Sequence, residues 1–206
     1  MRVAFKEWEI VVDALGRAEQ ILLLRKGGLH EGRGGFRPEH QRFLLFPTRY
    51  HQQRECVVAS AQARFGEMSH RRPVSAEMVR VEFGAELAEA RRLETLAQAK
   101  ALHGQHIWRE EVIERRFDWG KDRGIHVLAV RVFRLAHAVE LQMTTAYADC
   151  QSRIMLERDI ATDGATTVWH DLAFERKLAE FHAAADSLPS STKNCIVYCR
   201  APTLRT

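Results

Sequence analysis

The sequence of 206 residues contains little cysteine, little proline and no long apolar stretch. Its four cysteines are too few and too irregularly spaced for a disulfide framework, which favours a reducing compartment, so we expect a cytoplasmic protein. The apolar runs are far shorter than the about 20 residues of a membrane-spanning helix. The first residues also lack the apolar core of a secretory signal. We therefore expect neither secretion nor membrane insertion.

The overall composition is that of a globular protein. Hydrophobic residues make up 46% of the chain and charged residues 28%, values that exclude collagen-like, low-complexity and disordered chains. A chain of this length forms one domain and buries about 70% of its unfolded surface, so it needs no metal or disulfide to fold. We expect no cofactor and no bound metal.

Positive charge is concentrated near the N-terminus. The net charge is +4, and residues 1–54 hold ten Lys and Arg against six Asp and Glu, whereas 55–206 hold 21 of each. Of the 31 basic residues, 25 are Arg, whose planar guanidinium suits phosphate and carboxylate groups. This distribution is a weak indication of an anionic partner. A bias in genomic base composition accounts for the arginines equally well.

The hydrophobic pattern predicts a single α+β domain, with a mainly antiparallel sheet and three or four flanking helices. Loss of periodicity after residue 187 predicts a domain over 1–187 and a poorly ordered tail over 188–206. The expected strands cover 8–15, 20–25, 42–46, 76–83 and 125–135, with 139–143 pairing back on the last of them, and the expected helices cover 50–65, 85–102 and 171–185. The first two strands are separated by a short turn with one glycine, which indicates a hairpin.

A glycine-rich segment follows the second expected strand and is the strongest candidate site. Arg25 and Lys26 precede Gly27 and Gly28, and three more glycines follow by residue 35. Glycines let backbone N–H groups approach an anion, and the basic side chains supply countercharge. The spacing matches neither a P-loop nor a dinucleotide fingerprint. A loop that needs positive φ selects glycine too, so both interpretations stay open.

A second candidate lies where the third expected strand ends. Thr48 is placed to cap the next helix, with His51 and Gln52 in its first turn. A helix N-terminus presents free N–H groups to an anion, and a histidine there exchanges a proton near neutral pH. Simple capping is the alternative. If strands 20–25 and 42–46 are neighbours, both candidate segments meet at one edge of the sheet.

Several other residues are secondary candidates. Tryptophans beside polar residues are either packed aromatics or base-stacking platforms. A charge on an apolar strand face marks a buried ion pair or a ligand contact, and a cysteine becomes a nucleophile only when a base lowers its pKa. These candidates are Lys6, Glu7, Trp8, Glu31, His106, Trp108, Arg131, Tyr147 and Cys150. His103 with His106, and Cys195 with Cys199, are weak metal-binding pairs.

Taken together, these segments resemble the DUF1802 family, a bacterial family of unknown function. The resemblance runs from about residue 4 to 185. It departs at Ser152 and Arg153, where Ser-Trp is expected. It implies no assigned activity or catalytic residue, and the joining of family members to restriction-endonuclease-like domains implies a nucleic-acid context. The segments that carry it are Lys6-Glu7-Trp8, Ile21 to Gly28, Phe43 to Thr48, His51-Gln52, His106-Ile107-Trp108, Leu128 to Leu135, and Tyr147 with Cys150.

Three functions are consistent with these residues. The first is a non-catalytic module that binds nucleic acid or a nucleotide phosphate through Arg25, Lys26, the glycines and His51. The second is a protein-interaction partner that uses Trp and Arg at an interface. The third is a metal-dependent phosphohydrolase, for which Glu31 and Glu39 are the only acidic residues near the glycine-rich loop.

Overall fold

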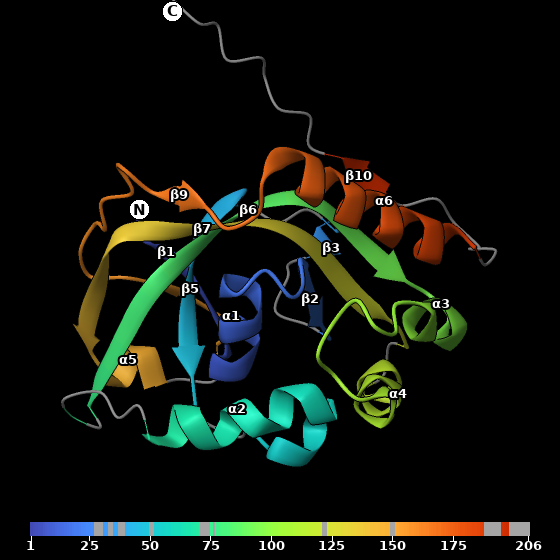
Figure 1. Cartoon of the computed structure of the whole chain (residues 1–206), viewed down its shortest axis with the longest axis horizontal. Coiled ribbons are helices and arrows are strands. Elements are labelled where there is room, and N and C mark those ends of the chain that lie inside the picture. The colour runs from blue at the N-terminus through green and yellow to red at the C-terminus, as the bar shows by residue number, and fades with distance from the viewer. Residues whose placement is uncertain are drawn as a thin grey trace, which may run out of the picture.

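The structure is a computed structural model. It describes residues 1–26, 31–32, 35–36, 40–49, 52–70, 75, 77–120, 123–148, 151–187 and 195–197. These residues form one α+β domain, as the sequence predicts, built from a strongly curled sheet and helices on both of its faces (Figure 1). The tail after residue 187 lies mostly outside the described residues, so the domain boundary there stays a prediction.

The main sheet is mixed. Its order is β2-β7-β6-β5-β1-β8, with β9 added to β7 and β10 added to β6. β1 and β5 run parallel, while the other neighbouring strands run antiparallel, so the expectation of a mainly antiparallel sheet is confirmed. The strands are β1 (Val3–Trp8), β2 (Leu22–Arg25), β5 (Arg42–Thr48), β6 (Met78–Leu93), β7 (Ile125–Gln142), β8 (Arg153–Met155), β9 (Thr166–Thr167) and β10 (Cys195–Val197), with a separate pair β3 (Glu31–Gly32) and β4 (Gly35–Phe36).

Six α-helices occur among the described residues, more than the three or four expected. They are α1 (Glu9–Gly16), α2 (Ala59–His70), α3 (Leu96–Ala101), α4 (Glu110–Asp118), α5 (Thr145–Ala148) and α6 (Asp171–Asp186), with a 3₁₀ turn η1 (Arg54–Cys56). Figure 1 shows the long strands β6 and β7 arching over α1, with α2 below and α6 on the outer side of the arch. In the part of the chain that the structure describes, no helix has both the length and the apolar character needed to cross a bilayer.

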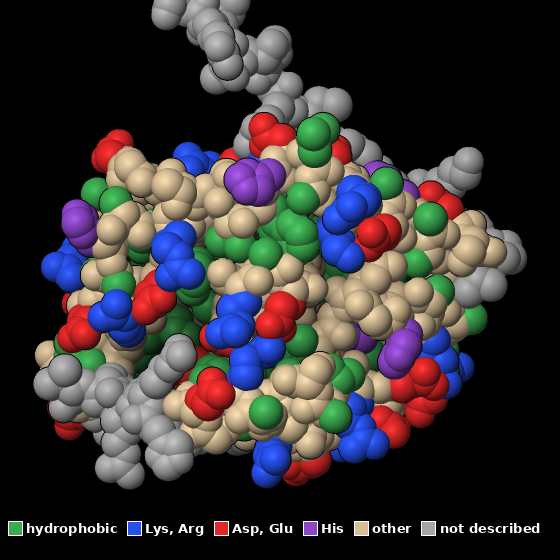
Figure 2. Space-filling model, in the orientation of Figure 1, with side chains coloured by type: hydrophobic (Ala, Val, Ile, Leu, Met, Phe, Trp, Pro, Cys, Tyr) green, Lys and Arg blue, Asp and Glu red, His purple; other side chains and the backbone are tan. Residues whose placement is uncertain are grey.

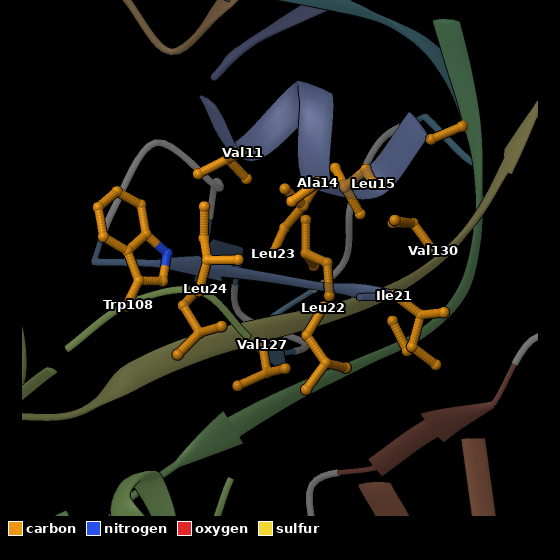
Figure 3. Close-up of a cluster of buried hydrophobic side chains, with 14 of the residues drawn as sticks. Val11, Ala14, Leu15, Ile21, Leu22, Leu23, Leu24, Trp108, Val127 and Val130 are labelled. Carbon is orange, nitrogen blue, oxygen red and sulfur yellow. The ribbon is translucent and has the colours of Figure 1, made fainter. Parts of the chain in front are cut away.

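The helix α1 replaces the strand expected over 8–15, so the hairpin prediction is wrong. Val11, Ala14 and Leu15 of this helix point at β2 and β7 from inside the curl (Figure 3). Because most of its residues are buried, its apolar pattern has no polar face that would show a helical period. At Gly16 an added Cβ would lie 2.3 Å from the Phe83 ring, so this close approach requires glycine.

The expected helix over 85–102 is wrong over 85–93, because residues 78–93 form one strand, β6, and only the end of the expected range is helical, as α3 (Leu96–Ala101). Leu87, Ala90 and Leu93 do recur at three-residue steps, which is typical of a helix. In the structure the register against β7 shifts between Leu87 and Glu89. A bulge inserts one residue and so converts the step from Leu87 to Ala90 into a three-residue step on one face of the strand. Pairing is continuous from Ala90 to Leu93, so these two residues lie on opposite faces. The long pairing with β7 then outweighs local helix propensity.

Three smaller expectations need correction. The helix expected over 50–65 begins only at Ala59, after η1, and Thr48 ends β5 instead of capping it. Residues 125–142 form one strand where a break after 135 was expected. Finally, β2 and β5 are not neighbours, since β7 and β6 lie between them.

Candidate functional site

Polar groups gather where β1 ends. The parallel register places Trp8 opposite Thr48 of β5. The Thr48 hydroxyl donates a hydrogen bond to the main-chain oxygen of Glu7 (3.2 Å), and the Trp8 N–H donates to Glu7 Oε1 (3.0 Å). The Glu7 side chain is only 11% exposed, so its carboxylate is fixed against the strand end.

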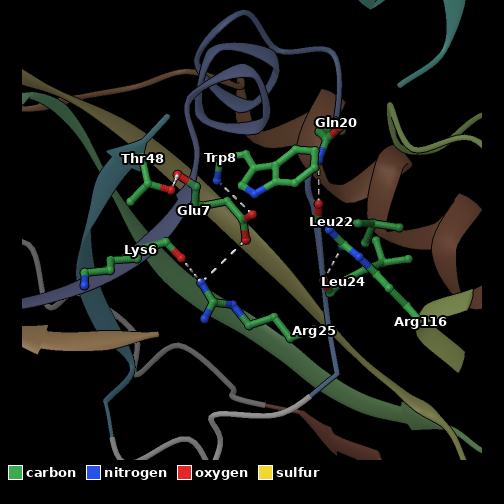
Figure 4. Close-up of polar contacts among 9 residues, drawn as sticks. All are labelled: Lys6, Glu7, Trp8, Gln20, Leu22, Leu24, Arg25, Thr48 and Arg116. Atoms are coloured by element: carbon green, nitrogen blue, oxygen red, sulfur yellow. Dashed lines mark hydrogen bonds and ion pairs between the residues drawn. The ribbon is translucent and has the colours of Figure 1, made fainter. Parts of the chain in front are cut away.

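Arg25 contacts the end of β1 although its own strand, β2, lies at the far edge of the sheet. It is the last residue of β2, and the curl of the sheet brings its Nη2 within 2.6 Å of the Lys6 main-chain oxygen and 3.5 Å of Glu7 Oε2 (Figure 4). Its guanidinium also lies 5.1 Å from the centre of the Phe5 ring. The side chain is 7% exposed. Glu7 and Arg25 therefore form a buried ion pair between β1 and β2.

Arg116 of α4 supplies a second guanidinium at the same place. It lies 3.8 Å from the ring centre of Trp108 and 5.9 Å from that of Trp8, and its Nη1 donates to the main-chain oxygen of Leu24 (3.3 Å; Figure 4). The two indoles pack edge to face, 4.8 Å apart. Stacking on aromatic faces is a common use of arginine. We call Glu7, Trp8, Arg25, Trp108 and Arg116 the arginine cluster.

The arginine cluster carries more positive than negative charge. It contains two guanidinium groups and one carboxylate, Glu7, which attracts both. Burial lowers the pKa of Arg25, and burial together with repulsion from Arg25 lowers that of Arg116. Within the described residues, the buried Nε of Arg25 has no hydrogen-bond partner. An added oxyanion would supply both the missing charge and a hydrogen-bond acceptor.

The surface in the view of Figure 2 has no large area of one charge. Basic and acidic side chains are interspersed across this face, with hydrophobic groups between them. Broad electrostatic attraction needs clustered charge of one sign. On this face, then, the structure offers no extended basic surface, and a local site such as the arginine cluster is the stronger candidate.

His106 lies beside the arginine cluster and has an unusual pKa. Its Nδ1 accepts a hydrogen bond from the Trp108 N–H (3.2 Å), and the side chain is buried. Burial, and then the neighbouring His103, lower the pKa of His106 from 6.5 to about 4. A histidine that stays neutral at pH 5 acts here as a hydrogen-bond acceptor that holds the Trp108 backbone.

We expect His106 to make folding stability depend on pH between about 6.5 and 4. The unfolded chain takes up a proton at His106 below pH 6.5, whereas the folded chain does so only near pH 4. The stabilisation of the folded state by neutral His106 is therefore present at pH 7 and is lost as the pH falls. The loss in the free energy of unfolding is about 2 kcal/mol between pH 7 and 4.5. Urea unfolding of wild type and His106→Asn should show a stability difference that shrinks by this amount. The exposed His137→Asn is the matched control, and a constant difference for His106→Asn would contradict the assignment.

Lys26 fixes the end of α4. Its Nζ donates to the main-chain oxygens of Phe117 (2.8 Å) and Gly124 (2.9 Å). A lysine at a helix C-terminus satisfies free carbonyl groups and opposes the negative end of the helix dipole. These contacts give Lys26 a positioning role for the segment after α4, next to Arg25 in sequence.

The comparisons with known proteins identify the family. The sequence profile of DUF1802, described as a domain of unknown function, matches residues 4–180. The chain belongs to the DUF1802 family. No curated protein matches this DUF1802 domain. Among solved structures it is similar to ASCH from Zymomonas mobilis, with a TM-score of 0.41 and 10% identity over 86% of this chain and 92% of that one. A mutant of the same protein gives a TM-score of 0.42 and 12% identity, over 86% of this chain and 95% of that one.

The DUF1802 domain brings together only part of the predicted site. Arg25 and Thr48 both hydrogen-bond to β1, and Trp8 and Trp108 pack together. Gln52 lies in the segment after β5, and its side-chain oxygen is buried with no hydrogen-bond partner among the described residues. Gly27, Gly28, His51, Cys150 and the side chain of Glu31 lie outside the described residues.

Arg131 and Tyr147 have structural contacts elsewhere in the DUF1802 domain. Arg131 is buried on β7, pairs with Asp171 of α6 and lies 5.0 Å from the Phe174 ring centre. The sequence left a buried ion pair and a ligand contact open for Arg131; the structure shows an ion pair in which Arg131 is buried and Asp171 is exposed. The Tyr147 hydroxyl accepts the Glu157 N–H (2.8 Å). Among the described residues, no three His, Cys, Asp or Glu side chains lie close enough to hold a metal.

Sequence reasoning missed Arg116. It lies next to Arg115 in a helix of charged residues, Glu-Glu-Val-Ile-Glu-Arg-Arg-Phe-Asp, which is typical of a solvated helix face. The available indication was its spacing from Ile113 and Phe117, both buried. That spacing places Arg116 beside the apolar face and explains why its guanidinium reaches the tryptophans.

Proposed function

We propose that this DUF1802 domain is a non-catalytic module that binds a phosphate group of nucleic acid or of a nucleotide at the arginine cluster. The observation that carries the proposal is the excess of positive charge in the arginine cluster, where, among the described residues, the guanidinium groups of Arg25 and Arg116 are attracted by one carboxylate, that of Glu7. Guanidinium groups bind phosphate through paired N–H donors. The link to restriction systems that the resemblance implies belongs to this proposal as its cellular context.

Arg116 is the group best placed to contact the phosphate. It is partly exposed, whereas Arg25 is almost fully buried. Within the described chain, one of its N–H groups is used on Leu24, so others remain for a ligand. The buried Arg25 then adds positive charge beneath the phosphate, and the Trp108 ring holds the plane of the Arg116 guanidinium in place.

We expect Arg116→Gln to weaken binding of a labelled oligonucleotide by at least about tenfold, because one charge-assisted contact is lost. The slope of log affinity against log salt should also become shallower by about one. Fluorescence anisotropy from low to high salt measures both. Circular dichroism of each variant confirms that it is folded.

The matched control is Arg80→Gln, which removes one positive charge from an exposed arginine of β6. Its affinity should stay close to that of wild type. Equal affinities for wild type and Arg116→Gln would contradict the proposal. So would an absence of binding to every oligonucleotide and nucleotide tested at low salt.

A further inference from the structure

Trp119 is an exposed aromatic residue directly after α4. Its side chain is 74% exposed, whereas tryptophan is highly buried on average. It lines an open hollow of about 740 Å³ together with Glu114, Arg115, Asp118 and Gly120. Within the domain it contributes little to the hydrophobic core. An exposed indole beside a hollow is a candidate contact surface.

Several contacts hold the described residues on either side of Trp119, namely Phe117 before it and Arg123 and Gly124 after it. The Gly124 N–H donates to the main-chain oxygen of Phe117 (3.2 Å), and Lys26 Nζ donates to the main-chain oxygens of both Phe117 and Gly124. Arg92 Nη2 donates to the main-chain oxygen of Arg123 (3.1 Å). These flanks are therefore fixed before any ligand binds, which reduces the entropy lost on binding.

Charged groups of both signs surround the hollow. Both of its carboxylates have ion-pair partners. Asp118 pairs with Arg123 (2.7 Å). Glu114 pairs with Lys100 (2.5 Å), which also pairs with Glu110 (3.0 Å). Arg115 has no carboxylate within ion-pair distance in the described part of the chain, and its Nη2 contacts only the Cys56 sulfur (3.8 Å). The hollow thus combines an aromatic face with a positive charge that is available to a phosphate.

The hollow lies next to the arginine cluster. Arg115 lines the hollow, and the adjacent Arg116 belongs to the cluster. Lys26, which follows Arg25, binds the main-chain oxygen of Phe117 two residues before Trp119. Both places are therefore built on the last turn of α4, and a polymer with alternating phosphates and bases has groups suited to each.

We propose that Trp119 is a stacking platform for a base of single-stranded nucleic acid whose phosphate is bound by the arginine cluster. The inference rests on the proposed function and narrows it to one ligand class. Bases in a duplex are stacked on each other and are not available to an indole, whereas single-strand binders combine a basic groove with aromatic platforms. A mononucleotide could not contact successive positions.

The test compares two labelled single strands of equal length, one with bases and one abasic, on the full chain. Trp119→Ala should weaken binding of the strand with bases by about tenfold and leave the abasic strand unchanged. Trp119→Phe should recover part of the loss. Leu172→Ala, at a position 88% exposed on α6, is the matched control and should change neither affinity.

The outcomes separate this inference from the proposed function. If Trp119→Ala changes neither affinity while Arg116→Gln weakens both, base stacking on Trp119 is excluded and phosphate binding at the arginine cluster is supported. If Trp119→Ala weakens both strands equally, its role is structural and the platform is again wrong. If wild type binds neither strand at low salt, the proposed function itself fails. A duplex bound as tightly as the single strand would also overturn the inference.

Discussion

We expect Trp108→Ala to lower the free energy of unfolding by about 3–5 kcal/mol. Trp108 is 1% exposed and is among the largest fully buried side chains of the domain. It packs edge to face against Trp8, supports the Arg116 guanidinium and pairs through its backbone with Val57. Removing the indole leaves a cavity between α1, β2 and α4, and such cavities collapse only partly.

Urea unfolding followed by circular dichroism measures this loss. Trp119→Ala, the same substitution at an exposed position, is the matched control and should change stability by less than about 0.5 kcal/mol. Trp108→Phe should fall between the two. If Trp108→Ala were no less stable than Trp119→Ala, the packing of the arginine cluster would be wrong.

Elements with a clear local pattern were predictable. Residues 125–135 form a long run rich in β-branched residues and are part of β7, and Phe174, Phe181 and Ala185 form the buried face of α6. For Arg131, a charge on an apolar strand face left an ion pair and a ligand contact both open, and the structure shows an ion pair with Asp171. In these places the local pattern and the tertiary contacts agree.

Prediction failed where tertiary structure changes the local period. The bulge after Leu87 produces a three-residue step in β6 that is typical of a helix, and enclosure inside the curled sheet makes α1 look like a strand. Neither a bulge nor complete burial can be recognised from one sequence by periodicity alone.

The candidate site was likewise predictable only in part. Arg25 and Thr48 do approach the same point, yet strand adjacency, the expected reason, is not the cause. The curl of the sheet brings β2 to β1 across the whole strand order, and each residue bonds to β1 independently. Closure of a sheet depends on many small twists between strands, which no short motif encodes. The Glu7–Arg25 pair therefore had to be seen in the structure.

Glu7→Gln is expected to lower stability and raise affinity for phosphate. The substitution keeps an oxygen that can accept the Trp8 N–H, but it removes the carboxylate of Glu7, which among the described residues is the one that attracts Arg25 and Arg116. Breaking a buried pair leaves an uncompensated charge, which costs about 3 kcal/mol in the ligand-free protein. An oligonucleotide phosphate then no longer competes with Glu7, so its affinity should rise severalfold.

Thermal unfolding with and without a single-stranded oligonucleotide measures both effects, because a ligand stabilises the folded state in proportion to the logarithm of its concentration relative to Kd. The matched control is Glu9→Gln, which removes the same charge from the more exposed pair with Arg49. Surface pairs contribute at most about 1 kcal/mol, so this variant should stay close to wild type in stability and affinity. If Glu7→Gln bound the oligonucleotide more weakly than Glu9→Gln, the carboxylate would be part of the ligand contact itself. The excess positive charge could then not be the reason why the arginine cluster attracts an anion.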